Sequence, residues 1–196
     1  MRNSRLFGLA ALIGFAAALG LSVANAPDDR RRAGPVASPA EQAALAIPAK
    51  FRLSETIAVH EQMHPADLSL AEEAGYRTVI DLRPDGEVAG QPAAETMAAA
   101  AKAIGLTFAY VPVPRGDIPD ETVAALAKVL NDAPGPVLLY CRSGSRAART
   151  WALAEASRAD GAPSDQIAAR IRTAGFEIDD IRPALDRRAA ARITKG

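Results

Sequence analysis

Short apolar runs alternate with helix-like stretches along the chain from Phe51 onward. The apolar runs predict strands at 56–59, 76–82, 106–111 and 137–140. The segment 51–53 would form a first strand or a hairpin together with 56–59. Helical spacing predicts helices at 65–74, 93–104, 120–131, 164–174 and 178–191, and one directly after 140–146. Strands that alternate with helices in this way are typical of a layered α/β fold.

Several predicted strands end in residues that can carry chemistry. The run 137–140 is wholly apolar, which predicts a central strand. The residues that follow the three strand ends are Arg83 and Asp85, Arg115 and Asp117, and Cys141. Because ligands collect at the carboxyl ends of parallel strands, we expect a site where these ends meet.

The amino-terminal segment has the pattern of an export signal. Basic residues precede an apolar stretch from Leu6 to about Ala24, and small residues at Ala24 and Ala26 suit a cleavage site. Pro27 would follow the scissile bond and hinder cleavage, and the apolar run is just long enough to cross a bilayer as a helix. Residues 1–26 therefore predict either a signal peptide or an uncleaved membrane anchor.

The remainder of the chain divides at about residue 48. Residues 27–48 are rich in alanine, proline and arginine and poor in bulky apolar side chains, which predicts a linker. Residues 49–196 are long enough for one domain with its own core, the predicted catalytic domain. The export signal places this domain outside the cytoplasm, in the periplasm or anchored to the membrane.

Charge and composition exclude several classes of partner. The 23 basic and 23 acidic side chains balance, so no overall field favours nucleic acid. A single cysteine excludes an intramolecular disulfide and a cysteine-based metal cluster. His60 and His64 are four residues apart, but Pro65 argues against one helix through both, and no third ligand is near in sequence. We therefore expect no metal and no cofactor, since nucleotide-binding motifs are also missing from the sequence.

The lone cysteine, Cys141, is the best candidate nucleophile. It lies in Tyr-Cys-Arg-Ser-Gly-Ser-Arg, residues 140–146, between the apolar strand and a helix. Backbone N–H groups and the positive end of the helix dipole would favour an anion in this loop and a thiolate at its base. Gly144 allows the tight bend, and Ser143 and Ser145 add hydroxyl donors.

The loop is similar to the Cys-x-x-Gly-x-Arg loop of rhodanese-type sulfurtransferases and to the longer Cys-x5-Arg loop of cysteine phosphatases. Here four residues separate Cys141 from Arg146, and Ala147 stands where the phosphatase pattern has its arginine. Tyr140 replaces the histidine that usually precedes the phosphatase cysteine. The shorter loop favours a persulfide sulfur over a phosphoryl group.

A longer resemblance extends over most of the chain after residue 48. Asp-Leu-Arg-Pro-Asp-Gly-Glu at 81–87, Gly-Gln-Pro at 90–92, Val-Pro-Val at 111–113, Pro-Gly-Pro-Val at 134–137 and the cysteine loop occur in one order, followed by Trp-Ala-Leu-Ala at 151–154. Together they resemble the phosphatase-like domain family of beta-lactamase hydrolase-like proteins. The resemblance implies a three-layer sandwich of the cysteine-phosphatase type, with a mostly parallel central sheet flanked by helices.

Roles at the predicted site follow from the chemistry of each side chain. Cys141 would carry a sulfur or phosphoryl group, and Arg146 would hold the anion of the substrate. Arg142 would either recruit that anion or project into solvent. Phosphate-ester hydrolysis also needs an acid, for which Asp117 is the first candidate and Asp120 the second, although turn formation and helix capping explain both.

For two side chains near the predicted site, a structural role is a simpler explanation than a role in binding. Arg83 would either line the rim of an anion site or pair with Asp85 or Glu87 within its turn. Trp151, at helical spacing from Ala148 and Ala152, is expected in the core.

Three functions remain open. The first is a sulfurtransferase that carries a persulfide on Cys141, acts on thiosulfate or a persulfide, and has a thiol acceptor or a sulfur-oxidising partner. The second is a phosphatase that hydrolyses phosphate monoesters through a phosphocysteine. The third is an anion-binding module without turnover.

Overall fold

The computed structural model describes residues 51–193. The predicted export segment and the predicted linker, residues 27–48, both lie outside the described residues. Residues 51–193 contain four strands: β1 (Ile57–His60), β2 (Thr78–Asp81), β3 (Thr107–Tyr110) and β4 (Val137–Tyr140). The helices are α2 (Asp67–Glu73), α3 (Ala94–Ala103), α4 (Asp120–Asp132), α5 (Ser145–Ser157), α6 (Ser164–Thr173), the 3₁₀ turn η3 (Asp179–Ile181) and α7 (Arg182–Ile193). No helix in this part of the chain is long and apolar enough to cross a membrane.

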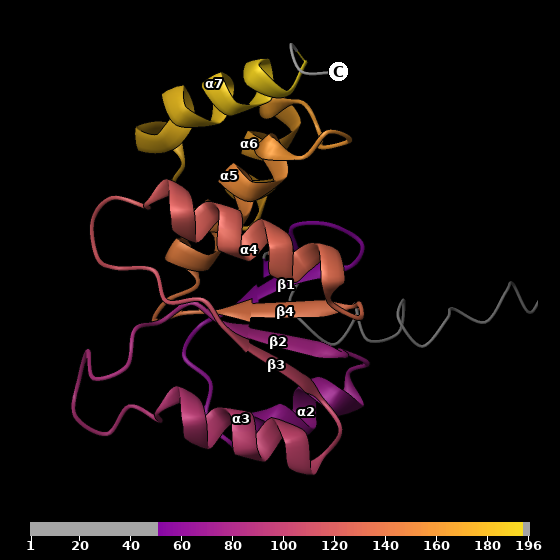
Figure 1. Ribbon diagram of the computed structural model, residues 1–196, viewed down its shortest axis with the longest axis vertical. Coiled ribbons are helices and arrows are strands. Elements are labelled where there is room, and N and C mark those ends of the chain that lie inside the picture. The colour runs from indigo at the N-terminus through magenta and orange to yellow at the C-terminus, as the bar shows by residue number, and fades with distance from the viewer. Residues whose placement is uncertain (1–50, 194–196) are drawn as a thin grey trace, which may run out of the picture. The chain divides into compact units, whose positions relative to one another are not determined.

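The strands form one parallel sheet in the order β1-β4-β2-β3 (Figure 1). Helices α2 and α3 cover one face, and α4 and α5 cover the other, with α6 and α7 packed beyond α5 (Figure 1). The predicted three-layer α/β sandwich is confirmed, with all four described strands parallel.

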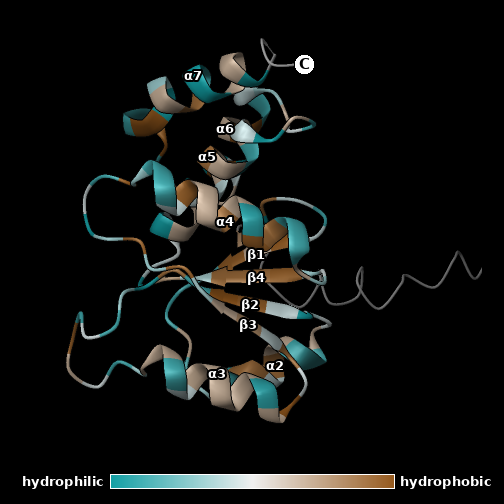
Figure 2. Cartoon of the chain, in the orientation of Figure 1, coloured by the Kyte–Doolittle hydropathy of each residue, from teal (hydrophilic) through white to brown (hydrophobic). Residues whose placement is uncertain are grey.

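Strand β4 is apolar throughout because both of its faces are buried. Val137 and Leu139 belong to the core beneath α4 and α5, whereas Leu138 and Tyr140 belong to the core above α2 and α3. The strand β4 accordingly has the hydrophobic colour over most of its length (Figure 2). Alternation along a strand sends the next residue, Cys141, back to the α4 and α5 side.

Two predicted segments differ from the structure. The helix predicted at 178–191 is divided into the 3₁₀ turn η3 and helix α7. Pro183 explains the division, because proline has no N–H and is tolerated only in the first turn of an α-helix. The predicted strand at 51–53 is reduced to an isolated antiparallel bridge between Arg52 and Ala58.

Candidate active site

Cys141 leaves the end of the central strand and starts a tight loop into helix α5. Gly144, the residue before the helix, has φ of +85°. A Cβ at this position would come 2.9 Å from Cζ of Phe176 and 3.0 Å from Cγ1 of Val59. Glycine is therefore required here both for its backbone conformation and for lack of space.

The loop has a buried base and an exposed rim. The Cys141 side chain is only 1% exposed, whereas Arg142 and Ser143 are exposed. The carbonyl of Arg142 accepts a hydrogen bond of 3.2 Å from the amide of Gln62, which ties the loop to the segment after β1. The exposed position of Arg142 is compatible with either role predicted for it.

Arg146 is held in place by the carboxylate of Glu87. Its Nη1 and Nη2 donate hydrogen bonds of 2.7 and 2.8 Å to Oε1 and Oε2 of Glu87, and Nη1 also donates to the carbonyl of Val113 at 2.7 Å. Burial lowers the pKa of Arg146, but Glu87, and to a smaller extent the Cys141 sulfur, raise it above its ordinary value. These bonds leave Nε and one N–H of Nη2 to face an anion.

Glu87 is the centre of a buried network of charges. Arg83 donates from Nε to Oε2 of Glu87 at 2.9 Å and from Nη1 to Oε1 of Gln62 at 2.6 Å. Arg115 approaches Oε1 of Glu87 at 3.5 Å from the exposed loop after β3. The hydrogen bonds from Arg146 and Arg83 lower the pKa of Glu87 to about 2, against the opposing effect of burial.

Arg83 therefore pairs with Glu87, which is the simpler of its two predicted explanations. The same pair contributes to the site, because the Glu87 carboxylate that Arg83 orients also binds Arg146. Asp85, the other predicted partner, instead accepts a hydrogen bond of 2.9 Å from the amide of Ala94 at the start of α3.

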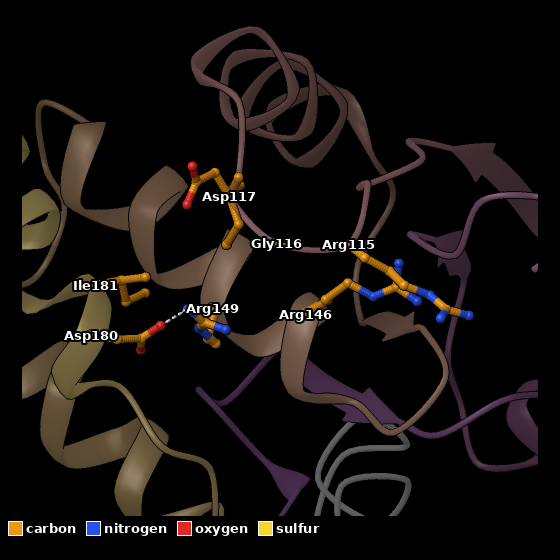
Figure 3. A pocket seen from close by; sticks show the side chains of 8 residues that line it. Arg115, Gly116, Asp117, Arg146, Arg149, Asp180 and Ile181 are labelled. Carbon is orange, nitrogen blue, oxygen red and sulfur yellow. Dashed lines mark hydrogen bonds and ion pairs between the residues drawn. The ribbon is translucent and has the colours of Figure 1, made fainter.

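The two candidate acids lie in different surroundings. Asp117 lines a cavity of about 450 Å³ together with Arg146 (Figure 3). Asp120 forms an ion pair with Arg188 of helix α7, which makes it a link between helices. Of the two, Asp117 is the one that lines the cavity, and its exposed carboxylate points away from Arg146 (Figure 3).

Comparison with known proteins identifies the family. Residues 50–158, more than half of the chain, match the family described as beta-lactamase hydrolase-like protein, phosphatase-like domain. The chain belongs to this family. The resemblance predicted from the ordered motifs is thereby confirmed.

Relatives of this phosphatase-like domain agree with that assignment. A beta-lactamase hydrolase-like protein of Xylella fastidiosa is 33% identical over 138 residues, which cover 70% of this chain and 32% of the relative. The chain thus spans about a third of the length of this curated relative.

Solved structures that are similar to the phosphatase-like domain include two phosphatase-type proteins. A candidate phosphatase from Neisseria meningitidis has a TM-score of 0.62 and 31% identity, covering 72% of this chain and 99% of that chain. TpbA of Pseudomonas aeruginosa, solved in complex with phosphotyrosine, has a TM-score of 0.53 and 17% identity, covering 75% of this chain and 93% of that chain. The second likeness shows the fold alone.

A buried carboxyl group lies beside Tyr140, the last residue of β4 before the cysteine loop of the phosphatase-like domain. Asp81 ends β2, pairs in register with Tyr140, and accepts a hydrogen bond of 2.8 Å from the amide of Arg83. Burial raises the pKa of Asp81 to about 6, although the Arg83 amide and Tyr140 oppose the shift. The Tyr140 hydroxyl is close enough to affect this carboxyl but lacks full hydrogen-bond geometry.

Two further residues that the sequence analysis considered, Trp151 and His60, make packing contacts. Trp151 is buried in the core on the α4 and α5 side, as predicted. His60 lies in an aromatic contact with Phe51, at 6.5 Å between ring centroids. Within residues 51–193, no group of three or more His, Cys, Asp or Glu side chains is placed to hold a metal ion.

The sequence did not indicate the roles of Glu87, Asp81 and Arg149 at this site. Glu87 was expected only as a turn partner, because the sequence shows its neighbour Arg83 but not a contact 59 residues away. Arg149, which lines the cavity beside Arg146, follows it by three residues on helix α5. That spacing was the one available signal, since such residues share a helix face.

Proposed function

We propose that this phosphatase-like domain hydrolyses phosphate monoesters through a phosphocysteine intermediate on Cys141. The observation that carries the proposal is the cavity that Asp117 and Arg146 both line, because it gives one site a carboxyl group that can donate a proton and a guanidinium that can bind an anion. The Cys141 sulfur is close enough to Arg146 to raise the pKa of that guanidinium. The family description and the Neisseria meningitidis relative support the same chemistry.

The first step transfers the phosphoryl group to the cysteine. The Cys141 thiolate attacks phosphorus while the bond from phosphorus to the ester oxygen breaks. Asp117 gives its proton to the departing oxygen, so the leaving group departs as a neutral alcohol or phenol. Arg146 and the loop amides before α5 bind the other phosphoryl oxygens.

The second step regenerates the enzyme. Water attacks the phosphorus of the phosphocysteine, and the Asp117 carboxylate takes the proton that the water loses. The sulfur–phosphorus bond breaks, releasing inorganic phosphate and the Cys141 thiolate. No metal, cofactor or further reactant enters this cycle.

Sulfur transfer through a Cys141 persulfide is the second candidate function. Loop length favours it, because only four residues separate Cys141 from Arg146. The relatives that are described by activity are phosphatases, so they support the first candidate better.

One experiment separates the candidates. The full-length chain in detergent, with Cys141→Ser beside it, is assayed for p-nitrophenyl phosphate hydrolysis and for intact mass after incubation with phosphate ester or thiosulfate. We expect hydrolysis and a phosphoryl adduct on the wild type only. A sulfur adduct without hydrolysis would favour sulfur transfer, and anion binding without either reaction would indicate a binding module.

We also propose that the domain acts outside the cytoplasm. The support is the apolar stretch from Leu6 to about Ala24 that follows basic residues. Fusion of alkaline phosphatase after residue 48 should give an active reporter. An inactive but intact fusion protein would contradict export.

A further inference from the structure

The cavity that holds Asp117 extends beyond the anion-binding loop. It opens between the loop after β3, helix α5 and the 3₁₀ turn η3, and three of its lining residues are arginines (Figure 3). These arginines are Arg115, Arg146 and Arg149. Asp180 of η3 also lines the cavity, where it pairs with Arg149 (Figure 3).

The three arginines differ in how fully they are paired. Arg146 gives three hydrogen bonds to Glu87 and Val113, so most of its donors are already committed. Arg115 has only a 3.5 Å approach to Glu87, and its side chain is 61% exposed. Arg149 is the best placed for a ligand, because it is mostly buried and incompletely satisfied.

Arg149 has a single acceptor among the described residues. Its Nη2 donates to Asp180, whereas Nε is buried without a hydrogen-bond partner in the described part of the chain. The Arg149 side chain is 21% exposed and that of Asp180 is 63% exposed. An exposed carboxylate keeps most of its hydration while it is paired with a guanidinium, so such a pair contributes little free energy. An anionic ligand can therefore displace the carboxylate easily.

We propose that Arg149 binds a second anionic group on the leaving portion of the substrate. The inference rests on the proposed phosphatase function. The phosphoryl group would lie at Cys141 and Arg146, the ester oxygen at Asp117, and the second anion would displace Asp180 from Arg149. The substrate class is therefore a phosphate monoester whose alcohol or phenol carries a carboxylate or another phosphate.

The pairing of Arg149 with Asp180 makes the proposal testable in two directions. The measured quantity is the ratio of kcat/KM for benzene-1,4-bisphosphate to kcat/KM for phenyl phosphate, with the full-length protein. Arg149→Leu should lower this ratio about 10-fold, because a charge-assisted hydrogen bond is lost. Asp180→Asn should raise the ratio several-fold by removing the competing carboxylate.

A neighbouring ion pair provides the control. Arg172 of α6 and Asp179, the first residue of η3, form an exposed pair of 2.6 Å and do not line this cavity. Arg172→Leu should leave the ratio unchanged. Equal ratios in all variants, or a fall in the Arg172 variant as large as in the Arg149 variant, would overturn the proposal.

A binding measurement distinguishes failure of the subsite from failure of the phosphatase proposal. Calorimetric Kd values for the same two esters are compared in Cys141→Ser and in Cys141→Ser combined with Arg149→Leu. If the wild type hydrolyses neither ester but Cys141→Ser still prefers the bisphosphate through Arg149, the function fails and the subsite stands. If hydrolysis occurs without any preference in kcat/KM or in Kd, the subsite fails and the function stands. Absence of preference in binding together with absence of hydrolysis would overturn both.

Discussion

The Glu87 carboxylate receives hydrogen bonds from both terminal nitrogens of Arg146, although 59 residues separate them in sequence. The paired geometry fixes the plane of the guanidinium before any anion arrives. Arg83 fixes Glu87 in turn, so the orientation of Arg146 depends on a buried partner that does not itself face the substrate. An anion then meets a donor that needs little reorganisation.

Glu87→Gln should therefore impair both stability and activity. The change leaves Arg83, a buried cation, without a charged partner, which costs about 3 kcal/mol in the free energy of unfolding. Misplacement of Arg146 should reduce kcat/KM for p-nitrophenyl phosphate by roughly 100-fold. Urea unfolding and steady-state kinetics measure the two effects.

Glu95→Gln is the matched control for that variant. Glu95 is exposed in the first turn of α3, so the same substitution there should change stability by less than about 0.5 kcal/mol. Full activity in a folded Glu87→Gln protein would show that Arg146 does not depend on Glu87 for its orientation.

Gly144→Ala should disrupt the cysteine loop more than an ordinary glycine replacement. The positive φ costs about 1 kcal/mol or more for alanine, and the new methyl group would collide with Phe176 and Val59. Gly175→Ala is the comparison, because Gly175 has φ of +84° but open space around the added Cβ. Thermal unfolding should show a larger loss for Gly144→Ala, and equal losses would exclude the steric contribution.

Asp117→Asn should slow the proposed phosphatase reaction in a way that depends on the leaving group. Poor leaving groups such as alkyl alcohols need a proton, so their kcat/KM should fall by about 100-fold or more, while p-nitrophenyl phosphate loses less. Asp120→Asn should show no such dependence, because Asp120 pairs with Arg188 away from the cavity. A uniform loss across leaving groups would assign Asp117 a role other than proton donation.

Asp81→Asn should change how stability depends on pH. Burial raises the pKa of Asp81 from 3.8 to about 6, so the folded state holds this proton more tightly than the unfolded chain does. The wild type therefore loses stability as pH rises from about 4 to about 6, by at most about 3 kcal/mol, and the loss is complete above that range.

Urea titrations at several pH values test this linkage. The free energy of unfolding of Asp81→Asn, minus that of the wild type, should increase between about pH 4 and pH 7 and then level off. A difference that stays constant with pH would mean that Asp81 titrates alike in the folded and unfolded chain.

The sequence predicted the layers well, because periodicity and turn residues act locally. The strands at 78–81, 107–110 and 137–140 all fall inside predicted runs, and the wholly apolar run is the buried strand β4. The predicted final helix was too long at its start, where Pro183 acts against continuous α-helix. Strand order could not be derived from the pattern, because it depends on contacts between distant segments.

The candidate site was predictable where its chemistry lies in one short segment. Cys141, Gly144 and Arg146 are close in sequence, and the structure places them in the loop after β4 and the first turn of α5. The network around Glu87 and the pair of Arg149 with Asp180 were not predictable, since tertiary packing alone brings those residues together. A carboxylate in a turn looks the same in sequence whether it faces water or a buried guanidinium.

Because Cys141 directly follows β4, exposure of its thiol to solvent depends on unfolding of the whole sheet. All four residues of β4 are buried and pair in register with β1 on one side and with β2 on the other. Amides in such a strand exchange with solvent only through large-scale opening, whereas fraying of the surrounding loops leaves them protected. Heating should therefore release the nucleophile from its loop at the same point at which the sheet comes apart, so accessibility of the thiol to an alkylating reagent would report on cooperative unfolding of the domain.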